Sequence, residues 1–163
     1  MTIAVRSARS EDAEEIATIF AHYVEHSDAT FVETPPSEEE WRSRIEAATL
    51  PFLVALAGQR VLGFARLTQW RDKDAYRGTA EDAVYVAPAA TGRGIGGALL
   101  GALIDRAGGS GIREIIAVIA DTGDEASMRL HLAAGFNERG RLTRVGHKHG
   151  RWLDTTLLQL SLR

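Results

Sequence analysis

The sequence predicts a single α/β domain over residues 1–163, with helices on both faces of a mixed sheet. Three observations lead to this fold class. At 45% hydrophobic and 25% charged, 163 residues have the size and composition of one globular core. Apolar periodicity predicts the order strand, helix, helix, three strands, helix, strand, helix and two strands. No internal repeat or linker divides the chain.

The first half of the chain predicts a strand, two helices and a hairpin. Ser10 is the expected N-cap of the first helix, and Ser37 with Glu40 matches a capping box ahead of the second. The pair Gly58-Gln59 between two apolar, β-rich runs predicts an antiparallel hairpin. The expected segments are a strand near 3–5, helices over 10–24 and 37–48, and strands over 51–57 and 61–69.

The second half predicts a right-handed strand–helix–strand unit, a helix and two more strands. Pro88 ends the first strand, Gly108-Gly109 ends the first helix, and Gly135 ends the last helix. Residues 113–120 are apolar on both faces, as in a central parallel strand. The expected segments are strands over 82–86 and 113–120, helices over 95–107 and 125–134, and strands over 139–145 and 155–162.

Composition excludes several kinds of site. The chain has no cysteine, which rules out disulfides, a thiolate nucleophile and cysteine-based metal sites. No segment approaches the roughly 20 apolar residues of a membrane span, and no signal peptide is recognised, so a cytoplasmic protein without a membrane partner is expected. A net charge of −3 argues against nucleic acid, although the chain after residue 50 is net positive and suits either an anionic ligand or solvent.

A glycine-rich turn over residues 91–97 precedes the predicted helix 95–107. Glycines allow successive backbone N–H groups to point at one ligand, and the helix N-terminus adds partial positive charge, which together suit a pyrophosphate. Arg93 adds a full charge beside them.

Three alternatives to a coenzyme turn exist. Gly92, Gly94 and Gly97 match the dinucleotide pattern G-x-G-x-x-G, but too few residues remain for the further strand–helix units of that fold. A P-loop is excluded, because no lysine and hydroxyl residue follow Gly97. A plain tight turn stays open, although it needs fewer glycines.

Three motifs in chain order carry a resemblance. They are Asp82-Ala-Val-Tyr-Val86, Gly92-x-Gly94-x-Gly96 and Gly123-Asp-x-x-Ser127-x-x-Leu-His131-x-x-x-Gly135-Phe136. Together they resemble the acetyl-CoA signature of the GCN5-related N-acetyltransferase (GNAT) superfamily, over nearly the whole chain.

Four further motifs resemble the phosphinothricin and methionine sulfoximine acetyltransferases within that superfamily. They are Phe31-x-Glu33-Thr34-Pro35, Trp70-Arg71, Tyr76-Arg77-Gly-Thr-x-Glu81 and Gly146-x-Lys148-x-Gly150-x-Trp152-x-Asp154. Thr91 departs from the Arg or Gln usual in the family, and Asp124 departs from the usual Asn. Asp124 is also an expected N-cap of the last helix.

The resemblance implies a mostly antiparallel mixed sheet whose parallel strands 82–86 and 113–120 splay apart to admit the pantetheine of acetyl-CoA. It also implies a homodimer, with segment 140–154 near the interface. The implied cofactor-binding residues are Val86, Ala87, Pro88, Gly92, Arg93, Gly94, Ile95, Gly96, Gly97, Asp124 and Ser127.

The expected chemistry is direct attack of an amine on the thioester. Glu81 is the candidate base, because an amine that is protonated at neutral pH must lose a proton before it attacks. An N–H near Val86 would stabilise the developing oxyanion. His131 is the candidate acid for the leaving thiolate, with a purely structural histidine as the alternative. Glu81 likewise has a surface glutamate as its alternative.

Substrate-binding residues are expected around Glu81. Arg71 and Arg77 are candidates for an α-carboxylate, while Phe31, Trp70 and Tyr76 would wall the side-chain pocket. Solvated arginines and core aromatics are the alternatives. The resemblance adds Glu33 to this set. His147 and His149 lack a third close ligand, so no metal is expected.

The sequence therefore predicts transfer of acetyl from acetyl-CoA to the α-amine of a small amino-acid analogue of the phosphinothricin or methionine sulfoximine class. Acetylation of another amine, such as a peptide N-terminus or an amino sugar, is one alternative. A non-catalytic acyl-CoA-binding module is another.

Overall fold

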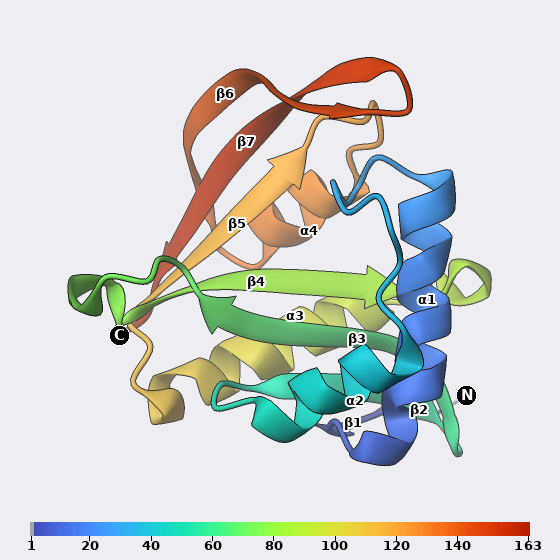
Figure 1. Cartoon of the computed structure of the whole chain (residues 1–163). Helices are drawn as coiled ribbons and strands as arrows, with labels where there is room; N and C mark the ends of the chain where they lie inside the picture. Colours follow the sequence, from blue (N-terminus) through green and yellow to red (C-terminus); the bar gives the residue numbers. More distant parts are fainter. Residues whose placement is uncertain (1) are drawn as a thin grey trace.

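The computed structural model describes residues 2–163 and contains one seven-stranded sheet in the order β1-β2-β3-β4-β5-β7-β6 (Figure 1). The strands are β1 (Ala4–Ser7), β2 (Phe52–Ala57), β3 (Arg60–Gln69), β4 (Thr79–Val86), β5 (Glu114–Ala120), β6 (Asn137–Lys148) and β7 (Arg151–Ser161). The helices are α1 (Ala13–His26), α2 (Glu38–Ala47), α3 (Ile95–Ala107) and α4 (Ala126–Ala133). Only β4 and β5 pair in parallel, so the mixed, mostly antiparallel sheet is confirmed.

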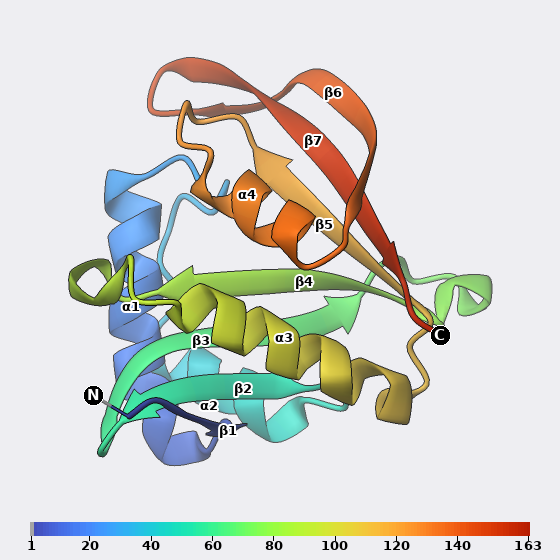
Figure 2. The ribbon, with the colours of Figure 1, turned by 180° about the vertical axis from the view of Figure 1, so that it is seen from behind.

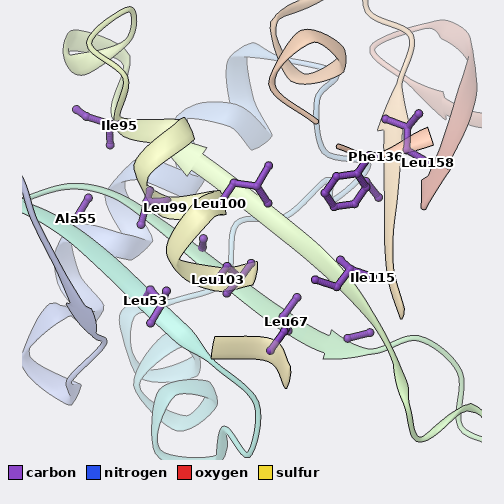
Figure 3. Packing of buried hydrophobic residues seen from close by; sticks show 14 of the residues in the cluster. Leu53, Ala55, Leu67, Ile95, Leu99, Leu100, Leu103, Ile115, Phe136 and Leu158 are labelled. Atoms are coloured by element: carbon purple, nitrogen blue, oxygen red, sulfur yellow. The ribbon is translucent and has the colours of Figure 1, made fainter. Parts of the chain in front are cut away.

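The sheet has one pair of helices on each face. Helices α1 and α2 lie in front of it in Figure 1, and α3 and α4 lie in front in the reverse view of Figure 2. One apolar core joins the sheet to α3, where Leu99, Leu100 and Leu103 face the strands (Figure 3). A second core joins the sheet to α1 and α2 around the aromatic rings of Phe20, Trp41, Phe52 and Phe64.

Gly63 of β3 allows α3 to lie close to the sheet. A Cβ atom at this position would stand 2.9 Å from the carbonyl oxygen of Tyr85 and 3.1 Å from Cδ1 of Leu99. Because α3 packs directly over β3, its N-terminus is held at the end of β4 where the glycine-rich turn enters.

Two local predictions are confirmed and one is wrong. Helix α3 spans 95–107 as expected, and the Ser37 side chain accepts the N–H of Glu40 at 3.1 Å in a complete capping box. Ser10 does not cap α1: it begins a 3-10 turn, its hydroxyl donates to Glu46, and α1 starts only at Ala13. The buried carboxylate of Asp12, which binds Arg6 and the N–H of Arg9, holds this turn instead.

The ends of the later elements also differ from expectation. Gly108 keeps helical angles and the left-handed residue is Gly111, because a 3-10 turn over Gly108–Ser110 extends α3. Gly135, with φ of 100°, follows α4 as expected. Strand β4 begins at Thr79, so Glu81 lies inside the strand and not before it.

The β6–β7 hairpin is much longer than the sequence predicts. It reaches Lys148 and turns through His149 and Gly150, both with positive φ. The apolar alternation is interrupted by register shifts after Glu138 and after Leu142, which explains the short prediction. No helix within residues 2–163 is both long and apolar enough to span a membrane.

Candidate active site

The two parallel strands part after three residue pairs. Thr79, Ala80 and Glu81 of β4 pair with Glu114–Ile116 of β5, and beyond Glu81 the strands diverge, as Figure 1 shows. The splayed strands expected from the resemblance are therefore confirmed. Each strand keeps its other neighbour, since β4 pairs with β3 as far as Val86 and β5 pairs with β7 as far as Ala120.

A cavity of about 710 Å³ runs through this gap. Its lining includes residues from 27–29, 82–86, 90–97, 117–120 and 126–131, together with Tyr23, Asp124, His149 and Arg151. The cavity thus joins the glycine-rich turn at the start of α3 to the start of α4 and to the turn of the β6–β7 hairpin.

The edge of β4 that faces the gap offers unpaired backbone groups. Ala87 donates its N–H to the carbonyl of Leu62 at 2.8 Å, which fixes the alternation of the β3–β4 ladder. The N–H groups of Val84 and Val86 consequently point away from β3 and into the gap. The Val86 carbonyl accepts the Tyr23 hydroxyl, whose pKa is raised by burial and by the charge of Asp124. An extended ligand can add to this edge as a strand does.

The glycine-rich turn presents bare amides to the same cavity. Gly92 and Gly94 have φ of 78° and 79°, and a Cβ atom on either would meet nothing within 4 Å. Gly94 is the N-cap of α3 without any side-chain cap, and the first helical bond is donated by Ala98. The N–H groups of Ile95, Gly96 and Gly97 are therefore oriented for an anion, which favours a ligand site over a plain turn.

Some predicted cofactor residues lie outside the cavity. Ala87, Pro88 and Arg93 line a second cavity of about 510 Å³ between α1 and the turn, and the N–H of Ala87 is already bound to Leu62. Asp124 and Ser127 do line the first cavity. Asp124 accepts the N–H of Ala126 at 2.9 Å, although the N-cap position of α4 belongs to Glu125.

A buried ion pair in the wall of the first cavity links β4 to α4. The Nε2 atom of His131 lies 2.7 Å from Oδ2 of Asp82, and Nδ1 lies 2.8 Å from the Ser127 carbonyl. Burial lowers the pKa of His131, but the hydrogen bond and charge of Asp82 and the Ser127 carbonyl outweigh it, so the pKa is raised above 6.5. Both ring N–H groups of the imidazolium are then donated within the protein. The sequence showed no sign of this pairing.

Glu81 lies on the opposite face of β4 from Asp82, at the last pair before the gap. Its carboxyl group is half-buried, and this burial together with the negative charge of Asp82 raises its pKa above 4.5, against the opposing charges of Arg71 and Arg66. A raised pKa makes this carboxylate a stronger base than an exposed glutamate.

The predicted substrate residues divide into two groups. The guanidinium carbon of Arg71 lies 3.9 Å from the Trp70 ring centroid, and its positive charge acts to lower the pKa of Glu81. The Arg77 guanidinium instead donates a hydrogen bond to the Asp74 carbonyl. Tyr76 and Glu33 are exposed. None of the predicted substrate residues lines the first cavity, and Glu81 does not line it either. These substrate residues are Phe31, Glu33, Trp70, Arg71, Tyr76 and Arg77.

The hairpin motif seats the loop that follows α1. Gly146 has no side chain because the ring of Phe31 occupies that space, only 2.3 Å from an ideal Cβ. Buried Lys148 donates to the carbonyls of Ser27 and Thr30, and Asp28 binds His149 and Arg151. This loop also supplies Thr30 to the Tyr85 hydroxyl, whose pKa burial raises to about 12.

Residues 14–136 match the acetyltransferase (GNAT) family model. The chain belongs to the GNAT acetyltransferase family. This GNAT protein is an acetyl-CoA-dependent N-acetyltransferase, with acetyl-CoA as its co-substrate. Residues 2–163 contain no cluster of three or more histidine, aspartate or glutamate side chains that could hold a metal ion.

Individual GNAT relatives align with nearly the whole chain. The chain is 45% identical over 161 residues to the phosphinothricin N-acetyltransferase of Alcaligenes faecalis, covering 97% of this chain and 82% of that protein. It is 38% identical to the L-methionine sulfoximine/L-methionine sulfone acetyltransferase of Pseudomonas paraeruginosa, covering 99% and 96%. The crystal structure of a phosphinothricin acetyltransferase from Sinorhizobium meliloti in complex with acetyl-CoA superposes with a TM-score of 0.93 at 41% identity, covering 99% and 89%.

Asp82→Asn tests the buried pair. A histidine with a raised folded-state pKa contributes stability that is full below the unfolded value near 6.5 and is lost as pH rises through the folded value. We therefore expect Asp82→Asn to lower the free energy of unfolding by about 1–3 kcal/mol near pH 5.5 and by less near pH 9. Denaturant titrations at both pH values measure this.

The matched control is Asp105→Asn, an exposed aspartate on α3, which should leave stability unchanged at both pH values. NMR titration of the imidazole should show a lower His131 pKa in Asp82→Asn. A His131 titration identical to wild type would contradict the pairing.

Proposed function

We propose that this GNAT enzyme transfers the acetyl group of acetyl-CoA to the α-amine of a small amino-acid analogue of the phosphinothricin or methionine sulfoximine/sulfone class. The observation that carries the proposal is the half-buried Glu81 at the apex of the β4–β5 gap, with guanidinium groups close enough to affect its pKa. The activities of the two curated relatives support the same substrate class.

The cofactor follows the gap in this proposal. Its pyrophosphate binds the amides of 92–97, and its pantetheine lies along the free edge of β4 with Asp124 and Ser127 nearby. The Val86 N–H donates a hydrogen bond to the thioester carbonyl oxygen and stabilises the tetrahedral oxyanion, a contribution typically about 3 kcal/mol. Ala87, Pro88 and Arg93 support the turn from its outer side.

Proton transfer is assigned to two residues. Glu81 takes the proton of the ammonium, directly or through one water, and the neutral amine attacks the thioester without a covalent enzyme intermediate. His131 supplies a proton to the thiolate, for which its Nε2–H must leave Asp82. A thiol with a pKa around 8.5 is a tolerable leaving group even without that proton.

The substrate lies on the face of the sheet that carries Glu81. Arg71 binds the α-carboxylate, and Trp70 with Phe31 flanks the side chain. Glu33, Tyr76 and Arg77 are assigned to the outer rim of the substrate site.

A homodimer completes the proposal, formed through the β6–β7 hairpin. Leu142, Val145 and Trp152 are 47%, 52% and 60% exposed on this hairpin, which is a large apolar exposure for one hairpin in a free monomer. The cytoplasmic location expected from the sequence belongs to the same proposal.

An amine panel tests the substrate class. Release of free coenzyme A is followed with acetyl-CoA and phosphinothricin, methionine sulfone, a peptide N-terminus or an amino sugar. We expect release only with amines that carry an adjacent carboxylate. Faster turnover of the peptide or the amino sugar would contradict the proposed substrate class. Tight binding of acetyl-CoA without release of free coenzyme A in the presence of any amine would indicate a non-catalytic module.

Glu81→Gln tests the base. The amide cannot accept the ammonium proton, so kcat should fall about 10²–10⁴-fold while the affinity for acetyl-CoA stays nearly constant. In wild type, kcat/KM should fall at low pH with an apparent pKa above 4.5, because burial and Asp82 raise the Glu81 pKa. Stopped or continuous thiol assays across pH measure both effects.

The control for this variant is Glu138→Gln, an exposed glutamate on β6 that should keep wild-type kinetics. Unchanged turnover in Glu81→Gln would remove the base assignment.

A further inference from the structure

Arg66 is a half-buried arginine in the middle of β3, on the face that carries Glu81. Its guanidinium carbon lies 5.2 Å from the Trp41 ring centroid and 5.8 Å from that of Phe52. The side chain therefore covers the aromatic core under α2, and its guanidinium group lies on the sheet face that carries Glu81.

Within residues 2–163 the Arg66 guanidinium makes neither an ion pair nor a hydrogen bond, and the carboxylate of Glu81 acts on it only through its charge. Burial lowers the pKa of Arg66 below the usual range of arginine, and the positive charge of Arg44 lowers it further, against the opposing charges of Tyr85 and Glu81. By contrast, the pKa values of Arg6, Arg42 and Arg141 are raised, because each of these guanidinium groups is hydrogen-bonded to a carboxylate. A cation that loses water without gaining a hydrogen-bonded anion is costly, and a bound anion would offset that cost.

The register places Arg66 next to the proposed base. Arg66 is opposite Ala83, and Thr68 is opposite Glu81. Arg66 and Glu81 are therefore diagonal neighbours on one face of the sheet, a relation that places Cα atoms about 7–8 Å apart. Ala83, which lies opposite Arg66 on the same face, has only a methyl side chain. Arg71 also acts on the Glu81 carboxyl, from the loop after β3.

We propose that Arg66 is a subsite for an oxyanion at the far end of the substrate's side chain. The inference rests on the proposed function and gives the enzyme, within that substrate class, a preference for α-amino acids with a side-chain phosphinate, phosphonate or carboxylate. The ammonium meets Glu81, the α-carboxylate meets Arg71, and the distal anion forms a forked pair with Arg66. Nothing in the sequence pattern distinguishes Arg66 from a strand residue exposed to solvent.

Arg66→Met tests the subsite with two substrates that differ at the far end. Phosphinothricin carries an anionic phosphinate, whereas methionine sulfone ends in a neutral sulfone. We expect KM for phosphinothricin to rise about tenfold or more and KM for methionine sulfone to rise less than about threefold. KM for acetyl-CoA should stay within about twofold. Arg66→Lys keeps the positive charge but cannot form the forked pair, so its KM for phosphinothricin should lie between those of wild type and Arg66→Met.

Arg44→Met is the matched control, because Arg44 lies 4.8 Å from the same Trp41 ring but on α2. It should leave the ratio of the two KM values within about twofold of wild type. The melting temperature of Arg66→Met should not fall, since an apolar chain of similar length replaces an uncompensated cation.

An unchanged KM ratio in Arg66→Met would overturn the subsite. Should wild type turn over neither amino acid, the proposed function fails separately, and calorimetry with phosphinothricin and coenzyme A decides about Arg66. Weaker phosphinothricin binding by Arg66→Met than by wild type would support the subsite, and equal binding, or no binding to either, would overturn it.

Discussion

The structure depends on the early parting of β4 and β5. Only three residue pairs join the two strands, whereas each makes seven pairs with its neighbour on the other side. The sheet therefore stays continuous while its centre opens. Backbone groups along the opening cannot be satisfied by the sheet itself, so they require water or a ligand that imitates a strand.

The same opening separates the two carboxylates that meet at its apex. Side chains alternate across a strand, so Asp82 faces α4 and forms a buried pair with His131, while Glu81 faces the side proposed for the substrate. Asp82 is thereby committed to structure, and its charge still helps to raise the Glu81 pKa. Two further contacts hold the segments around the opening in place. The Tyr23 hydroxyl donates to the Val86 carbonyl, and the Phe31 ring packs against Gly146 of the β6–β7 hairpin.

Local sequence signals predicted the elements whose ends are chemically marked. The capping box at Ser37, the glycines before α3 and Gly135 after α4 each specify a backbone geometry, and the structure follows them. The prediction that Ser10 is the N-cap was wrong because the carboxylate of Asp12, two residues later, accepts the Arg9 N–H and binds Arg6. The β6–β7 hairpin was underestimated because it carries glycine and charged residues whose partners lie in the loop after α1.

The site was predictable only where it is local. The turn over 91–97 and the position of Glu81 could be proposed as parts of a site from sequence and family resemblance, because their signals lie in short segments of the chain. The pair of Asp82 with His131 spans 49 positions, and the setting of Arg66 requires β2, α2 and β4 together. Such contacts arise from topology, which a single sequence does not encode in any short pattern.

Amide hydrogen exchange along β4 tests the role of the gap most directly. When acetyl-CoA is added, the N–H groups of Val84 and Val86 should become protected, because they face the gap and gain a partner. Those of Ala83 and Tyr85, which the ladder alternation directs toward β3, should change little. Exchange at Val84 and Val86 that is the same with and without a saturating amount of acetyl-CoA would contradict a cofactor paired along this edge.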